Sequence, residues 1–238
     1  MDITAVLNCH NEGRALHPSL LSLADAVQVA RESGLTVEII IVADMASEAT
    51  MAHLDEFAPA GSLVLSVVLG DLGLSRNAAV GRASGSYVGF LDADDLWGPN
   101  WLRDAFLFSE SLHEEVICHP RANLLFGDSE GLKIHPDQDL EIVAEEVLFA
   151  QNCWSALSFA PRSVYERVPY SAIDLANGFG FEDWQWNAET VGLGFKHRAV
   201  PDTFHCIRIR DSMASLTVRS DENACVIGPA RLFSLPTD

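Results

Sequence analysis

The chain has 238 residues, of which 48% are hydrophobic and 21% are charged. This length and composition suit one large domain with its own core, and they exclude a disordered or low-complexity chain. Acidic residues outnumber basic residues 34 to 15, giving a formal net charge of −19, so nucleic acid and anionic membrane surfaces are unfavourable partners. An anionic substrate would need local positive charge in its site, and a divalent metal ion is the obvious source.

The sequence also predicts a cytoplasmic protein without a membrane span. No segment reaches the ~18 apolar residues that a membrane-spanning helix needs. The first apolar run, residues 3–7, gives way at once to polar residues, which is not the pattern of a signal peptide. The five cysteines include no Cys-x-x-Cys pair, which is typical of reduced thiols and not of a disulfide framework or a zinc site.

The first half of the chain alternates predicted strands and helices. Strands are predicted at residues 3–7, 37–42, 63–68 and 87–91. Helices are predicted around residues 16–27, after a capping Ser47, and at residues 78–83. The unbroken apolar run at 37–42 is typical of a strand buried on both faces of a parallel sheet. The alternation predicts an α/β fold with a mixed, mainly parallel central sheet flanked by helices.

Beyond Pro99 the alternation weakens. Helices are predicted at residues 100–112 and 181–191, strands at 122–126, 154–159, 195–200 and 203–209, and a polar loop at 128–139. No internal repeat or linker interrupts the chain. We therefore expect residues 1–238 to form a single domain.

Polar residues follow each predicted strand of the first half, at 8–12, at Asp44, at 70–77 and at 92–95. In open parallel sheets ligands bind beyond the carboxyl ends of the strands, where such clusters converge. Asp92, Asp94 and Asp95 repel one another unless a cation joins them, and Mg²⁺ is usually held by one or two carboxylates together with substrate phosphates. The cluster predicts a metal–diphosphate site, although Asp95 fits equally the start of the turn at 97–99.

Four segments resemble motifs of GT-A glycosyltransferases, specifically the large inverting family called family two. They are residues 6–12, 42–44, 74–95 and 181–184, and the resemblance runs in order over about residues 3–215. It implies a GT-A, Rossmann-like fold and a hexosyltransferase-type enzyme that inverts the anomeric carbon. One sugar would move from a nucleotide-diphosphate sugar, most simply a UDP-sugar, to a hydroxyl of a saccharide or small-molecule acceptor, with Mn²⁺ or Mg²⁺. Processive relatives carry membrane helices and a Gln-x-x-Arg-Trp motif, and this sequence shows neither.

The resemblance also implies roles for single residues. Asn8, His10 and Glu12 would belong to the donor pocket, Asp44 would accept a hydrogen bond from the base, Arg76 would lie near the base or diphosphate, and Asp92 would approach the ribose or metal. Asp94 and Asp95 would hold the metal with His205, while Arg208 or Arg210 and Ser212 would fold over the diphosphate. Asp183 would be the catalytic base, with Glu182 and Trp184 toward the acceptor. Residues 1–98 would then form the nucleotide-sugar and metal half, 99–215 the acceptor half and 216–238 a C-terminal tail.

Several alternatives stay open. Ala43 stands where the family usually has an aspartate, and Asn8-Cys9-His10-Asn11 replaces the usual Pro-x-Tyr-Asn opening, so the donor is not specified. Glu182 and Asp183 also suit the acidic first turn of any helix, tryptophans usually pack in cores, and His205 is equally an ordinary strand histidine. The alternatives for the whole chain are an inactive nucleotide- or sugar-binding module of the same fold and a Mg-dependent nucleotidyltransferase. The nucleotidyltransferase is disfavoured because residues 8–13 contain one glycine and no lysine.

Overall fold

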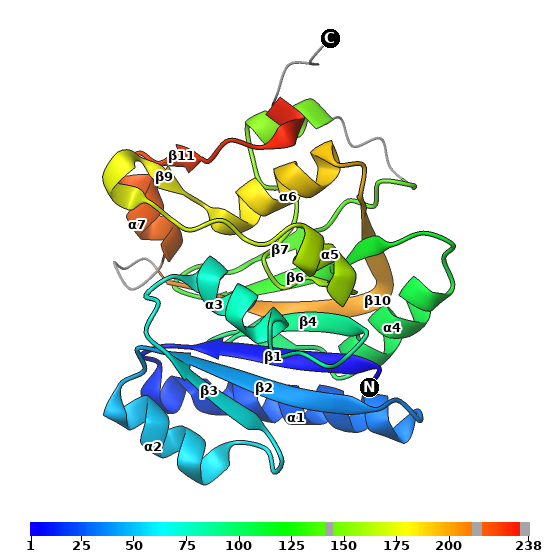
Figure 1. The fold of residues 1–238 in the computed structure, drawn as a ribbon, viewed down its shortest axis with the longest axis vertical. Helices are drawn as coiled ribbons and strands as arrows, with labels where there is room; N and C mark the ends of the chain where they lie inside the picture. The colour runs from blue at the N-terminus through cyan, green and yellow to red at the C-terminus, as the bar shows by residue number, and fades with distance from the viewer. Residues whose placement is uncertain (141–144, 211–215, 234–238) are drawn as a thin grey trace.

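The computed structural model describes residues 1–140, 145–210 and 216–233. Over these residues the chain forms an α/β fold around a mixed sheet of nine strands with helices on both faces (Figure 1). The sheet order is β3-β2-β1-β4-β8-β6-β10-β5, with β7 paired to β6, and a second small sheet joins β9 to β11. None of the described helices is long and apolar enough to cross a membrane.

The strands are β1 Ile3–Cys9, β2 Val37–Asp44, β3 Leu63–Val67, β4 Tyr87–Asp92, β5 Leu96–Trp97, β6 Val116–Gly127, β7 Gly131–Ile134, β8 Phe159–Pro161, β9 Phe179–Gly180, β10 Lys196–Ile209 and β11 Val226–Ile227. The α-helices are α1 His17–Glu32, α2 Glu48–Phe57, α3 Leu72–Val80, α4 Trp101–Glu110, α5 Arg162–Arg167, α6 Glu182–Gly192 and α7 Leu216–Glu222, and short 3-10 turns span Gly13–Leu16, Glu145–Phe149, Leu175–Asn177 and Arg231–Phe233. The pairs β1–β2, β1–β4, β2–β3 and β6–β10 are parallel, which confirms the predicted mainly parallel sheet.

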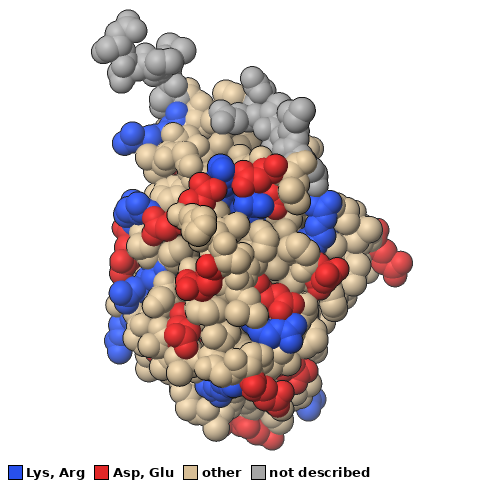
Figure 2. All heavy atoms as spheres, turned by 90° about the vertical axis from the view of Figure 1, so that its right-hand side faces the viewer, with Lys and Arg blue, Asp and Glu red and all other residues tan. Residues whose placement is uncertain are grey.

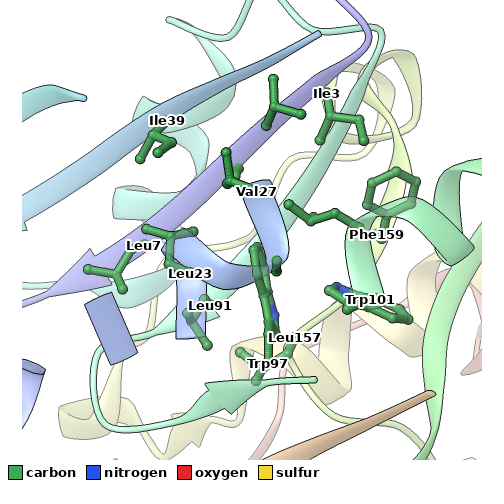
Figure 3. Close-up of a cluster of buried hydrophobic side chains, with 14 of the residues drawn as sticks. Ile3, Leu7, Leu23, Val27, Ile39, Leu91, Trp97, Trp101, Leu157 and Phe159 are labelled. Atoms are coloured by element: carbon green, nitrogen blue, oxygen red, sulfur yellow. The ribbon is translucent and has the colours of Figure 1, made fainter. Parts of the chain in front are cut away.

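The central strands are buried on both faces, as their continuous apolar runs predict. In β1, Ile3 and Leu7 point into a core formed with α1 and α4, whereas Val6 points into a second core beneath α3, α5 and α6. This alternation is the period of two that a strand imposes on its side chains. Figure 3 shows Leu23 and Val27 of α1 beside these strand residues in the first core.

The register of the first half brings the strand ends together. Asn8 of β1 lies opposite Asp92 of β4 on one side and Val42 of β2 on the other. The loops after these three parallel strands therefore open at one edge of the sheet. The polar clusters that follow the strands in sequence meet there.

The second half differs from the sequence prediction in several places. The two strands expected at 195–200 and 203–209 are one strand, β10, with a register shift between Val200 and Phe204. Asp202 at this bulge has a positive φ of 57°, and such a bulge bends a strand without ending it. The expected polar loop at 128–139 contains β7, and the expected tail contains α7 and β11.

Two further elements begin at other residues than expected. The helix predicted at 78–83 is α3, and it starts at Leu72 because the Asp71 side chain accepts a hydrogen bond from the Leu74 N–H. The sequence pattern missed the start of α3 because the residues next to the N-cap Asp71 are glycines and leucines without helical spacing. The strand expected at 154–159 is reduced to β8, which begins at Phe159.

Candidate functional site

One cavity of about 710 Å³ lies at the carboxyl ends of the parallel strands and takes its lining from both halves of the chain. Asp94, from the loop after β4, and Asp183, from α6, both line it. The predicted residues that line the cavity are Asn8, His10, Glu12, Asp44, Arg76, Asp92, Asp94, Asp95, Glu182, Asp183, Trp184, Arg208 and Arg210. Residues as far apart in sequence as Asn8 and Arg210 are thus collected into a single cavity.

The cavity lining carries charges of both signs, with eight acidic residues, namely Glu12, Asp44, Asp71, Asp92, Asp94, Asp95, Glu182 and Asp183. Five of the 15 basic residues line the cavity: Arg76, Lys133, Arg208, Arg210 and Arg219. Elsewhere the signs are mixed as well, and acidic and basic side chains are interspersed over the face in Figure 2. Because acidic residues outnumber basic residues in the lining, an anionic ligand here would need a cation beside the acidic groups as well as the arginines.

Asn8 presents an unused amide to the cavity. The side chain is 5% exposed, and neither its Oδ1 nor its Nδ2 has a hydrogen-bond partner among the described residues. A buried amide without partners is costly, so such a group usually marks a place where a ligand or water completes the bonds. Beside it, the His10 ring lies with Nδ1 2.5 Å from the Asp44 carbonyl oxygen.

The Asp44 carboxylate organises the loop after β3. It accepts hydrogen bonds from the backbone N–H groups of Leu69, Gly70 and Asp71 and from the Ser75 hydroxyl, at 2.7–3.1 Å. Burial raises the pKa of Asp44, but these four donors outweigh it and bring the pKa below its ordinary value. Because a carboxylate has about four acceptor sites, the structure commits Asp44 to the loop and leaves little capacity for a nucleobase.

Arg76 joins the two halves of the site. Its guanidinium is fully buried and donates to Glu182 Oε1 at 2.8 Å and to the Asp92 carboxylate at 3.1–3.2 Å. It also lies over the Tyr170 ring, 5.2 Å from the centroid. Burial lowers the pKa of Arg76, but Asp92 and Glu182 outweigh that effect and raise it. Through its Nη groups Arg76 holds these two carboxylates in place, while its buried Nε has no hydrogen-bond partner among the described residues.

The acidic loop, residues 93–95 after β4, carries two aspartates with different surroundings, Asp94 and Asp95. Asp94 contacts Arg210, with Oδ2 2.6 Å from Nη2. Burial raises the pKa of Asp94; Arg210 opposes this, while Asp92 and Glu12 add to it. Asp95 is buried, and its Oδ1 accepts the Arg208 N–H at 2.7 Å, so it fastens the loop to β10.

The acidic groups fit a divalent ion only with help from a ligand. Among the described residues, no group of three or more His, Cys, Asp and Glu side chains is arranged to hold a metal. Asp94, however, lines the cavity close to the negative charges of Asp92 and Glu12. Its contact with Arg210 offsets this negative charge only in part. This matches a Mg²⁺-type site with one or two carboxylates that substrate phosphates complete.

The structure does not bring His205 to this loop's cavity. Its ring is fully buried, packs edge-on against Trp101 with centroids 4.6 Å apart, and has no hydrogen-bond partner at either nitrogen among the described residues. His205 pairs with Trp97 across β10 and β5, so the strand pleat turns it into the core. Ser212, expected in the closing loop, lies outside the described residues.

Asp183 occupies the first turn of α6, as predicted. The residue that precedes the helix, Phe181, has a left-handed φ of 57°, which is uncommon for a bulky residue. Burial raises the pKa of Asp183, while Arg76, the Trp184 N–H and Lys133 oppose it. In its ionised form, a carboxylate with a raised pKa is a stronger base than a solvated one.

The two tryptophans of α6 have different surroundings. Trp186 is 2% exposed, its indole N–H donates to the Val168 carbonyl, and its ring stacks on Tyr165 and Tyr170. Trp184 is partly buried and lines the cavity, while its N–H donates to the Leu148 carbonyl at 2.8 Å. Trp186 is therefore a core residue, and Trp184 keeps a ring surface toward the cavity.

Lys133 and Asn152 are site residues that the sequence did not reveal. Lys133 of β7 and Asn152 of the loop before β8 both line the cavity, and Asn152 Nδ2 donates to Asp183 Oδ2 at 2.9 Å. Neither Lys133 nor Asn152 belongs to a recognisable sequence motif. Only the antiparallel pairing of β7 with β6 carries Lys133 to the site, so no sequence signal marks them.

Comparisons with known proteins agree with this architecture. The sequence model of glycosyl transferase family 2 matches residues 4–133. TarS residues 1–349 from S. aureus, solved with UDP-GlcNAc, align with a TM-score of 0.64 at 16% identity, covering 89% of this chain and 60% of that chain. The mannosyltransferase PcManGT from Pyrobaculum calidifontis, solved with GDP-Man and Mn²⁺, aligns with a TM-score of 0.62 at 15% identity, covering 96% and 65%.

These structural similarities establish the GT-A fold. Because the sequence identities are only 15–16%, they establish nothing beyond the fold. This chain spans 60% of the TarS chain and 65% of the PcManGT chain. A search of curated protein sequences found no match.

Proposed function

This chain belongs to glycosyl transferase family 2, and we propose that it moves one hexose-type sugar from a nucleotide-diphosphate sugar to an acceptor hydroxyl with inversion at the anomeric carbon. The observation that carries this proposal is the shared cavity of Asp94 and Asp183, which come from the two halves of the chain. A diphosphate beside the acidic loop and an acceptor beside α6 would then have the anomeric carbon between them. The donors bound in the related structures, UDP-GlcNAc and GDP-Man, make UDP- and GDP-sugars the first to test.

In the proposed reaction, Asp183 removes the proton of the acceptor hydroxyl. The acceptor oxygen forms a bond to the anomeric carbon while the bond from that carbon to the diphosphate oxygen breaks and its electron pair leaves with the diphosphate. Two features support this role: Asp183 lies at the positive end of the α6 dipole, which favours its ionised form, and its burial makes that form more basic. Attack from the side opposite the leaving group inverts the carbon.

The donor half would hold the leaving group. The Asn8 amide offers a donor and an acceptor to the nucleoside, and Arg208 and Arg210 line the cavity near the acidic loop, where they can offset diphosphate charge. His10 and Glu12 line the same end. Asp44 would act by fixing the loop after β3, and Arg76 would fix the carboxylates of Asp92 and Glu182 through its Nη groups.

Asp94 would hold Mn²⁺ or Mg²⁺ together with diphosphate oxygens, and Asp95 would support the loop through its bond to the Arg208 N–H. When bound, the metal would stabilise the negative charge that develops on the departing diphosphate. The ion would compete with Arg210 for the Asp94 carboxylate, whose Oδ2 contacts Arg210 Nη2.

The test compares wild type with Asp94→Ala, Asp183→Asn and the control Asp55→Asn, an exposed position on α2. Binding of UDP and GDP with Mn²⁺ is measured by calorimetry, and release of UDP or GDP from UDP-glucose, UDP-GlcNAc and GDP-mannose measures turnover. We expect Asp94→Ala to lose Mn²⁺-dependent binding and Asp183→Asn to bind normally with turnover reduced at least ~100-fold. Full turnover by Asp183→Asn would remove Asp183 from the mechanism.

The same assay separates the alternatives. Tight nucleotide binding by wild type with no turnover of any donor, in the presence of varied sugar acceptors, would favour the binding module. Pyrophosphate release from a nucleoside triphosphate plus a sugar phosphate would favour the nucleotidyltransferase.

A further inference from the structure

We propose that Asn152 is a positioning residue for the Asp183 carboxylate, held in a single orientation by Asn187 and Lys133. This inference rests on the proposed function, in which Asp183 is the base, and adds residues that no motif includes. Asn152 belongs to the loop between Phe149 and β8, and its Nδ2 donates to Asp183 Oδ2 at 2.9 Å.

The Asn152 amide is fixed at both ends of its side chain. Its Oδ1 accepts a hydrogen bond from Asn187 Nδ2 at 2.9 Å. Asp183 and Asn187 are four residues apart on α6 and so lie on one face of the helix, one turn from each other. The amide of Asn152 therefore spans that turn, and its NH₂ group must face Asp183 because its oxygen is held by Asn187.

The backbone of Asn152 is held as well. Lys133 Nζ donates to the Asn152 carbonyl oxygen at 3.1 Å, which ties the loop to β7. Nearby, the Trp184 indole N–H donates to the Leu148 carbonyl and the Trp154 indole N–H donates to the Pro136 carbonyl, which fasten the loop to α6 and to the chain after β7. Asn152 thus has little freedom to turn away from Asp183.

This arrangement suits a base that must keep an acceptor site for the incoming proton. The Asn152 amide contacts Oδ2, and the Trp184 N–H also donates to the carboxylate. A carboxylate has about four acceptor sites, so these two donors leave capacity for the proton of the incoming hydroxyl. A neutral amide donor favours the ionised carboxylate without forming an ion pair that would quench its basicity. Lys133 acts in the same direction from a greater distance, because its ammonium favours the charged form of Asp183.

The charged and titratable groups around Asp183 come from four other places in the fold. They are Arg76 of α3, Asp92 of β4, Lys133 of β7 and Tyr170 before α6, together with the neighbouring Glu182. None of them is altered by a substitution at Asn152 or Asn187. A change in the titration of Asp183 in those variants therefore reports the loss of the amide contact.

The experiment measures the pKa of Asp183 directly, by carboxyl ¹³C NMR of protein labelled at aspartate, with Asp183→Asn assigning the signal. We expect Asn152→Ala to raise the pKa of Asp183 by about one pH unit, because a donor to the charged form is lost. The acidic limb of the pH–rate profile for donor turnover should move by the same amount. Asn187→Ala keeps the donor but frees its orientation, so we expect a smaller rise in the same direction.

Asn100→Ala is the matched control. Asn100 also donates through Nδ2 to an aspartate, Asp104, at 2.7 Å, but it lies outside the cavity lining. We expect it to leave the pKa of Asp183 unchanged. The kinetic readout should show a roughly tenfold loss of kcat in Asn152→Ala with an unchanged KM for the donor.

An unchanged Asp183 pKa in folded Asn152→Ala would overturn the proposal. If that variant does not fold, an unchanged Asp183 pKa in Asn187→Ala overturns it instead, and the expected rise supports it. Undiminished turnover by Asp183→Asn is a separate result: it refutes Asp183 as the base and so the proposed mechanism, whatever Asn152 does to the titration.

Discussion

Arg76 Nη1 lies 2.8 Å from Glu182 Oε1, in a buried ion pair that links α3 of the first half to the first turn of α6. The same guanidinium contacts Asp92 at the end of β4. The helix that carries Asp183 is therefore connected through one arginine to the strand that leads into the acidic loop. The position of Asp183 relative to Asp94 therefore depends on the Arg76–Glu182 ion pair.

We expect Arg76→Met to lower the free energy of unfolding by about 3–5 kcal/mol, because it leaves the buried Glu182 carboxylate and the partly buried Asp92 carboxylate without their partner. Chemical denaturation monitored by fluorescence measures the loss. The control is Arg103→Met, which removes a partly exposed pair with Asp104 and should cost less than about 1 kcal/mol. Equal losses in the two variants would contradict the structural role of Arg76.

Replacing Asn8 should have little effect on stability, or increase it, and should impair binding. Its amide is buried without partners, so we expect Asn8→Ala to change the free energy of unfolding by only about 1 kcal/mol, in either direction, and Asn8→Leu, which fills the space, to raise it. Both variants should bind UDP and GDP at least about tenfold more weakly by calorimetry. Asn77→Ala provides the contrast, because Asn77 exchanges two hydrogen bonds with the Tyr170 backbone and should lose stability. Unaltered nucleotide affinity in both Asn8 variants would exclude the amide from the donor pocket.

Asp44→Ala should loosen the loop after β3. Three backbone N–H groups and the Ser75 hydroxyl lose their acceptor, and we expect a cost of about 2–4 kcal/mol in unfolding free energy. Hydrogen exchange should become faster at Leu69, Gly70 and Asp71 while α1 keeps its protection. Asp44→Asn, which keeps one oxygen, should cost less. Slow exchange at the loop in Asp44→Ala would show that other contacts hold it.

A group of buried histidines should make the protein sensitive to mild acid. His119 Nε2 lies 2.9 Å from His197 Nδ1, and the rings stack beneath Trp154. Burial lowers the pKa of His135 and of His197 to about 3. Since an unfolded histidine titrates near 6.5, the stability that each neutral ring contributes is present above pH ~6.5 and is lost progressively as pH falls toward about 3.

The measurement is the difference in unfolding free energy between wild type and His135→Gln as a function of pH. The difference cancels the opposite effect of Glu182 and Asp183, whose raised pKa values add stability as pH falls. We expect wild type to lose about 2 kcal/mol relative to His135→Gln between pH 7 and pH 5. The exposed His113→Gln should show a constant difference, and a constant difference for His135→Gln as well would contradict the prediction.

The sequence by itself determined the α/β class, the parallel first half and the acidic cluster after β4, because these follow from local properties. Apolar runs of strand length, helical spacing and Ser47, whose side chain caps α2 by accepting the Thr50 N–H, each act over a few residues. The motif around Glu182 and Asp183 was also visible in the sequence, and the structure puts it in the first turn of α6 as expected.

Only the tertiary structure decided what each polar side chain does. Arg76 and Asp44 are engaged by protein groups that lie up to 106 residues away, and no local pattern encodes such pairings. His205 turns into the core because the register of β10 against β5 sets its face. Lys133 and Asn152 reach Asp183 through the pairing of β7 and the packing of a loop on α6. The side-chain types could be read along the chain, but their partners depend on which strands pair and which faces are buried.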